Sequence, residues 1–167
     1  MSSPPLGRSL SLLFSELING PRDQCYVLNM GDAGLLRSLD TLSAEAASAV
    51  PPNGGASIAA HVDHLLYGLQ LLNRWVAGER NPWDTADWTQ SWKRSRVTFD
   101  EWVSLRDRFR TEVLRWHESL AQARDLEGIE LNGAFASVAH LAYHMGAIRQ
   151  IDRAIRGPSA EEAQSAQ

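Results

Sequence analysis

The chain has 167 residues, of which 44% are hydrophobic and 22% charged, and its formal net charge is -4. This length suits one buried core rather than two full domains, and the negative charge disfavours electrostatic binding to nucleic acid. No basic segment precedes an apolar run at the N-terminus and no 18 apolar residues follow one another, so we expect a cytoplasmic protein without a membrane span. Cys25 is the single cysteine, which excludes an internal disulfide.

Hydrophobic residues recur at helical spacing from the beginning of the chain. A first amphipathic helix is predicted over Leu6 to Ile18, and it should end at Asn19-Gly20-Pro21. Asp32 is a plausible N-cap for a second helix, whose leucines recur every three or four residues and which should end before Pro51-Pro52.

Ser57 opens a long predicted helix that ends at Gly78. Its apolar residues step by four and three, as a bundle helix requires. They are Ile58, Val62, Leu65, Leu69, Leu72 and Val76. About 100° per residue places His61 and His64 on or beside the buried half of this helix.

The connector that follows is rich in tryptophan. Trp83, Trp88 and Trp92 are expected to pack on the ends of a helical bundle, and an aromatic lid over a binding site is the alternative. The sequence Thr98 to Glu101 is a capping box that fixes the start of the next helix, whose buried face runs from Trp102 to Leu120.

The last helix is predicted from Asn132 to Gly157-Pro158, with His140 and His144 on its buried face and with Arg149 and Arg153 in solvent. Four helices of 18 to 25 residues and a shorter first one indicate an all-α four-helix bundle with an additional N-terminal helix. We expect one domain over 1–158, with the first helix and its loop in 1–31, and a disordered tail over 159–167.

A pair of histidines four residues apart can direct both imidazoles at one metal ion. The spacing alone is a weak signal, but two histidines on one buried face need a shared partner. The third ligand would be His64 or His61, with His117 less well placed. Three imidazoles leave open positions, as in catalytic sites, and favour zinc or nickel. Glu112 could orient a ligand or act as a base, although a solvated or salt-bridged glutamate is the more common case.

The runs GGASIAAHVDHLLYGLQLLNRWVAGE, DWTQSW and HLAYHMGAIRQI resemble the DinB/YfiT-like superfamily of metal-dependent enzymes, from about residue 32 to residue 156. The resemblance implies an up-down-down-up four-helix bundle and assigns the metal ligands as His64, His140 and His144. It leaves His61 as a pocket residue, beside Glu112 and Trp88. Many members carry a glutamine three residues after the second histidine of the pair, where this chain has Ala147.

The resemblance also implies a choice of chemistry. It suggests a divalent-metal enzyme that carries out thiol S-transfer or isomerisation with a low-molecular-weight thiol, or hydrolysis, on a small-molecule substrate. Thiol chemistry is favoured because no general base stands beside the ligands, and no residue is assigned as catalytic. The alternatives are a non-catalytic stress-response protein that binds a metal or small molecule, and a vestigial site. The resemblance further suggests a homodimer.

Overall fold

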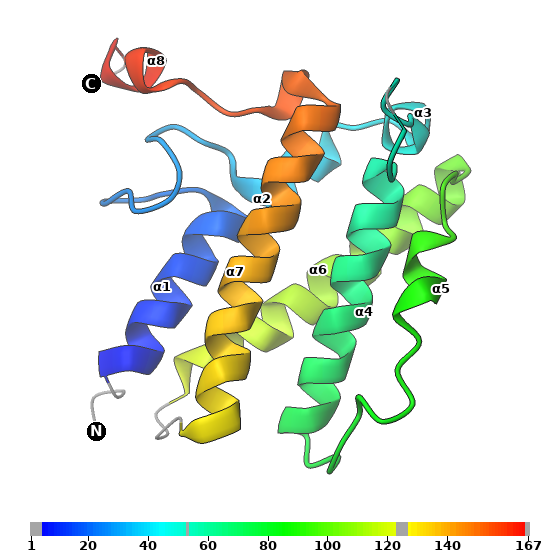
Figure 1. Cartoon of the computed structure of the whole chain (residues 1–167). Coiled ribbons are helices and arrows are strands. Elements are labelled where there is room, and N and C mark those ends of the chain that lie inside the picture. The colour runs from blue at the N-terminus through cyan, green and yellow to red at the C-terminus, as the bar shows by residue number, and fades with distance from the viewer. Residues whose placement is uncertain (1–4, 53, 123–126, 166–167) are drawn as a thin grey trace. The chain divides into compact units, whose positions relative to one another are not determined.

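The computed structural model describes residues 5–52, 54–122 and 127–165, and these residues form helices and loops without a β-strand (Figure 1). The all-α prediction is therefore confirmed. Contacts divide the chain into two compact units, Met1–Thr41 with Leu120–Gln167 and Leu42–Ser119, so the single domain expected over 1–158 stays a prediction. In the part of the chain that is described, no helix is long and apolar enough to span a membrane.

The first unit is built around α1 (Pro5–Asn19) and α7 (Gly128–Ile151), which pack side by side. It also contains α2 (Gly34–Asp40), which packs on α1, the 3-10 helix η1 (Arg153–Ile155) and α8 (Ala160–Ser165). The predicted first helix is confirmed, because α1 buries one apolar face and ends one residue before Gly20. The buried residues of that face are Leu10, Phe14, Leu17 and Ile18.

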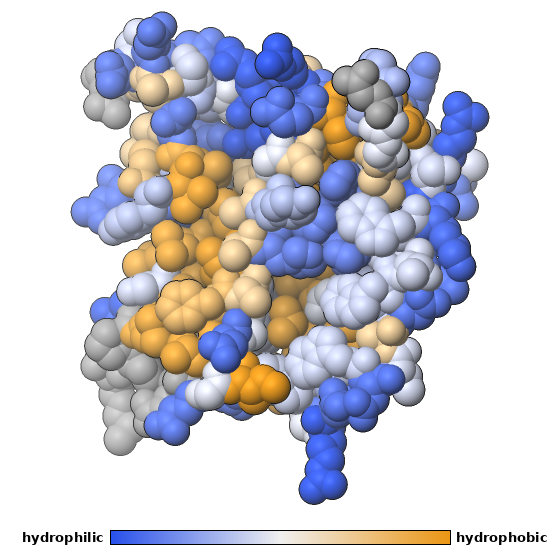
Figure 2. Space-filling view, viewed as in Figure 1, coloured by the Kyte–Doolittle hydropathy of each residue, from blue (hydrophilic) through white to orange (hydrophobic). Residues whose placement is uncertain are grey.

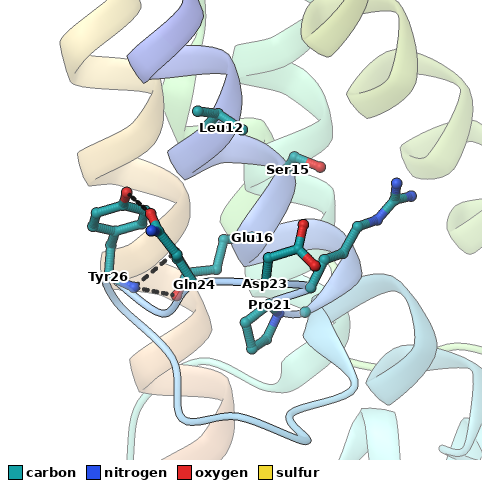
Figure 3. Close-up of a pocket in the computed structure, with 9 residues that line it drawn as sticks. Leu12, Ser15, Glu16, Pro21, Asp23, Gln24 and Tyr26 are labelled. Atoms are coloured by element: carbon teal, nitrogen blue, oxygen red, sulfur yellow. Dashed lines mark hydrogen bonds between the residues drawn. The ribbon is translucent and has the colours of Figure 1, made fainter.

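The loop after α1 is held by a buried carboxylate. Glu16 is only 5% exposed, and its side chain accepts hydrogen bonds from the backbone N–H groups of Tyr26, Val27 and Leu28, with shortest distances of 3.0, 2.8 and 2.7 Å. Figure 3 shows the bonds to Tyr26 at the edge of a surface pocket that α1 and this loop line. A charged acceptor that satisfies three backbone donors fixes the course of the loop.

The second predicted helix differs from the structure. Instead of one helix, the chain forms α2 and a separate α3 (Ala44–Ser48). Polar side chains cause the interruption: the Thr41 hydroxyl donates to the Ser38 carbonyl at 2.8 Å, and the Ser43 hydroxyl accepts from the Ala46 N–H at 3.1 Å as the N-cap of α3. Such side-chain bonds compete with a continuous helical ladder.

Asp32 and Arg149 also depart from expectation. The N-cap of α2 is Ala33, while the Asp32 carboxylate accepts the Gly34 N–H at 2.8 Å and the Arg149 guanidinium at 2.7 Å. The side chains of this ion pair are 3% and 13% exposed. The prediction that Arg149 lies in solvent is therefore wrong. Its guanidinium instead connects α7 to the start of α2 through Asp32.

The second unit contains α3, α4 (Ile58–Val76), α5 (Trp88–Trp92) and α6 (Phe99–Ala121), although the last two residues of α6 cluster with the first unit. Ser57 caps α4 as predicted, because its hydroxyl accepts the Ala60 N–H at 3.2 Å. The capping box of α6 is also confirmed by reciprocal bonds between Thr98 and Glu101 of 2.7 and 3.3 Å. The predicted stripe of α6 is buried throughout and consists of Trp102, Leu105, Phe109, Val113, Trp116 and Leu120.

The last helix begins earlier and ends earlier than its sequence signals indicated. It starts at Gly128. The preceding residue, Glu127, makes no side-chain capping bond, so the sequence carries no capping signal for the start of this helix. It stops at Ile151 because Asp152 takes an extended backbone conformation and its carboxylate accepts the Ala154 N–H at 2.9 Å. The sequence placed the end at Gly157, six residues later.

The tail after Gly157 contains a helix where we expected disorder. Ser159 and Glu162 exchange bonds of 2.6 and 3.2 Å at the start of α8, and Ala163 is buried. These capping bonds stabilise a short helix that hydrophobic content alone does not predict. The last two residues, 166–167, lie outside the described part.

The Glu16 carboxylate gives a direct test of the first unit. We expect Glu16→Gln to lower the free energy of unfolding by about 2 kcal/mol, because hydrogen bonds to a charged acceptor are lost and an amide N–H is turned toward backbone donors. Urea denaturation measures the loss, and hydrogen exchange should accelerate at the amides of Tyr26 to Leu28. The exposed Glu118→Gln is the matched control, and equal stability of both variants would contradict this role.

Candidate metal centre

The helix α7 brings His140 and His144 together. Four residues are slightly more than one helical turn, so both imidazoles leave the same side of α7. Their Nε2 atoms lie 2.9 Å apart and their rings meet edge to face, with centroids 4.5 Å apart. His144 is 3% exposed and has the Tyr143 ring against it, whereas His140 is half-buried.

Burial favours the neutral form of His140. Desolvation lowers the pKa of His140 below its ordinary value, so the neutral imidazole with a lone pair is favoured at neutral pH. Two lone pairs cannot face each other at 2.9 Å without repulsion, so either a proton or a cation must lie between them. Two metal–nitrogen bonds of about 2.0–2.1 Å each easily span this separation. The geometry of the pair therefore fits a divalent ion.

His64 is held in the second unit by the short helix α5. The His64 ring is 8% exposed, and its Nδ1 lies 3.1 Å from the hydroxyl oxygen of Ser91, which is 4% exposed. The Ser91 hydroxyl in turn donates to the Trp88 carbonyl at 3.1 Å. Ser91 was absent from the residues that sequence reasoning selected, because a serine inside a tryptophan-rich connector carries no spacing signal.

Two tryptophans of α5 cover the same histidine. Trp92 stacks on the His64 ring with centroids 4.3 Å apart and an interplanar angle of 26°, and Trp88 lies 5.5 Å from it. The sequence analysis predicts that these two residues pack on an end of the bundle. In the structure they pack instead on the face of α4 that carries His64. Trp83 does pack near the end of α4, edge-on against Trp75 at 5.2 Å.

Further contacts fasten α5 and its flanks to α4, which lies beside it in Figure 1. The Tyr67 hydroxyl accepts the Asp87 N–H at 3.0 Å, and Asp63 forms a 3.2 Å ion pair with Arg94. One contact lies before α5 and the other after it. The segment that reads as a loop in the sequence is thus pinned at both ends over His64.

The remaining site candidates have other partners. His61 is half-buried one turn before His64, where the Trp92 ring meets it edge-on at 5.4 Å and burial lowers its pKa. Glu112 is half-buried, and its carboxylate and its backbone carbonyl accept the Asn73 amide at 2.6 and 3.0 Å. Glu112 therefore links α6 to α4. The Cys25 thiol is exposed.

Among the described residues, His64, His140 and His144 form a set with the chemistry to hold one metal ion. All three are imidazoles, which suit zinc, nickel and similar divalent ions rather than the hard ions that prefer oxygen.

The model of the DinB superfamily matches residues 32–148, a region that contains all three histidines and α2 to α6 with most of α7. No curated protein and no solved structure matches the chain. The family match and the all-helical structure confirm the predicted fold class, an all-α helical bundle of the DinB type with an additional N-terminal helix. The chain belongs to the DinB superfamily.

Proposed function

We propose that this protein is a divalent-metal-dependent enzyme in which His64, His140 and His144 bind one ion, zinc or nickel. The observation that carries the proposal is the approach of the His140 and His144 Nε2 atoms to 2.9 Å on a buried helix face. Membership of the DinB superfamily supports it, because the matched region includes the third histidine. Neutral, desolvated imidazoles are the form in which histidine binds a metal.

A divalent ion with three protein ligands supplies Lewis acidity, which lowers the pKa of a water or thiol in an open position. The side chains around His64 would then form the wall that a small-molecule substrate meets. Trp88 and Trp92 are each 39% exposed, so their rings keep apolar surface available for such a substrate. These rings would exclude water from one side of the reacting groups.

We favour thiol S-transfer or isomerisation with a low-molecular-weight thiol over hydrolysis. Hydrolysis usually needs a carboxylate or histidine to take a proton from water. Glu112 is hydrogen-bonded to Asn73, and Asp63 is paired with Arg94, so the carboxylates of these two residues in the second unit are already engaged. A thiol cofactor brings its own nucleophile and reduces the demand for such a base.

Metal content tests the ligand set. Protein produced without a His-tag should contain about one divalent ion per chain, and His64→Ala, His140→Ala and His144→Ala should each lose most of it, because two imidazoles bind far more weakly than three. His117→Ala is the matched control and should keep the full content. Elemental analysis after dialysis measures both. A His64→Ala variant with undiminished metal would contradict the choice of third ligand.

Turnover separates the enzyme from a binding protein. We expect metal-loaded protein to consume an electrophile in the presence of a low-molecular-weight thiol, and to lose at least tenfold in rate when a chelator removes the metal. A panel of thiols and electrophiles followed by thiol titration and mass spectrometry measures the reaction. Metal-loaded protein that turns over none of them, and hydrolyses no ester or amide, would favour the non-catalytic metal-binding alternative.

We also propose that the protein is a homodimer that works in the cytoplasm. On α7, Phe135 and Tyr143 are 49% and 71% exposed, and exposed Ala139 lies between them at intervals of four residues. Figure 2 shows apolar residues gathered over α1 and the first half of α7. Such a face suits contact with a second copy of the chain.

Light scattering tests the dimer. The parent protein should have twice the mass of one chain, and Phe135→Glu should reduce the measured mass to that of one chain. A monomeric parent protein would contradict the dimer.

A further inference from the structure

The helix α5 contacts His64 at two points with different chemical consequences. Trp92 stacks on the ring face at 4.3 Å, which fixes the plane of the imidazole. Ser91 meets the ring edge at Nδ1, at 3.1 Å, which determines where the ring carries its proton. An imidazole with one face and one edge fixed has a single orientation in the second unit.

The direction of the hydrogen bond follows from the donors and acceptors present. A serine hydroxyl has one proton to donate, and Ser91 donates it to the Trp88 carbonyl at 3.1 Å. The oxygen that faces His64 Nδ1 can then act only as an acceptor. With the Ser91 proton on the Trp88 carbonyl, Nδ1 carries the ring proton in neutral His64 and Nε2 carries the lone pair.

We infer that Ser91 is a positioning residue that holds His64 as its Nδ1–H tautomer, so that Nε2 is the metal-ligating atom. Second partners of this kind orient metal-binding histidines and raise their basicity. The assignment matches the first unit, where the Nε2 atoms of His140 and His144 approach each other. The link to metal binding rests on the proposed function, whereas the tautomer of His64 does not.

The tautomer can be read without any metal. In ¹⁵N-labelled, metal-free protein above the titration range of histidine, long-range proton–nitrogen correlation spectra identify which nitrogen of each neutral ring is protonated. We expect His64 to be protonated on Nδ1. A proton on Nε2 of His64 in the parent protein would overturn the inference, whatever the metal-binding result.

Variants of Ser91 test the same point in a second way. Ser91→Ala should give His64 a mixture of tautomers and weaken zinc binding about 10- to 100-fold, whereas Ser91→Thr, which keeps a hydroxyl, should restore both. Ser95→Ala removes the same atom from an exposed serine of the same connector and should change neither. Competition with a chromogenic zinc chelator measures the affinity.

The outcomes separate the two claims. An unchanged His64 tautomer and zinc affinity in Ser91→Ala would overturn the role of Ser91. If the parent protein binds no zinc or nickel at all, the proposed function fails, and the tautomer of His64 in the parent and in Ser91→Ala still decides the inference. If Ser91→Ala does not fold, the spectrum of the parent protein decides it alone.

Discussion

Two imidazole nitrogens 2.9 Å apart on a buried helix face need a positive charge or a proton between them. The desolvation that lowers the pKa of His140 works against a charged ring, so the pair is satisfied either by one hydrogen bond between two neutral rings of different tautomers or by a cation that both rings ligate. A divalent ion satisfies both lone pairs without protonating either ring. The proposed metal site depends on that constraint, and we propose that the contacts around His64 orient a third imidazole for the same ion.

The segment between α4 and α6 contributes more to this arrangement than its composition suggests. It supplies a stacking ring, a hydroxyl and two anchoring contacts, all to one face of α4. Trp92 and Ser91 act on His64 itself, while the bonds Asp87–Tyr67 and Arg94–Asp63 hold the segment in place. A histidine side chain on a helix can change rotamer and tautomer at little cost. The contacts with Trp92 and Ser91 therefore hold the His64 ring in one orientation before any metal binds.

Local signals in the sequence predicted much of this structure. The caps at Ser57 and Thr98 were predictable because the bonds that form them join residues three positions apart, and the His140–His144 pair because helical geometry alone brings the two rings together. Two of the missed features are contacts between distant residues. Arg149 meets Asp32 across 117 positions and Ser91 meets His64 across 27, and neither leaves a periodic pattern. The start of α7 was misplaced for a related reason, since no side chain caps it.

X-ray absorption spectroscopy of the metal-loaded parent protein tests the central claim most directly, because it counts the imidazoles bound to each ion without reference to activity. The account predicts three imidazole ligands per zinc ion in the parent protein and two in His64→Ala loaded at high zinc concentration, with the remaining positions filled by light oxygen or nitrogen donors. A parent spectrum with two imidazoles or fewer, or an unchanged count in His64→Ala, would contradict a site made by His64, His140 and His144.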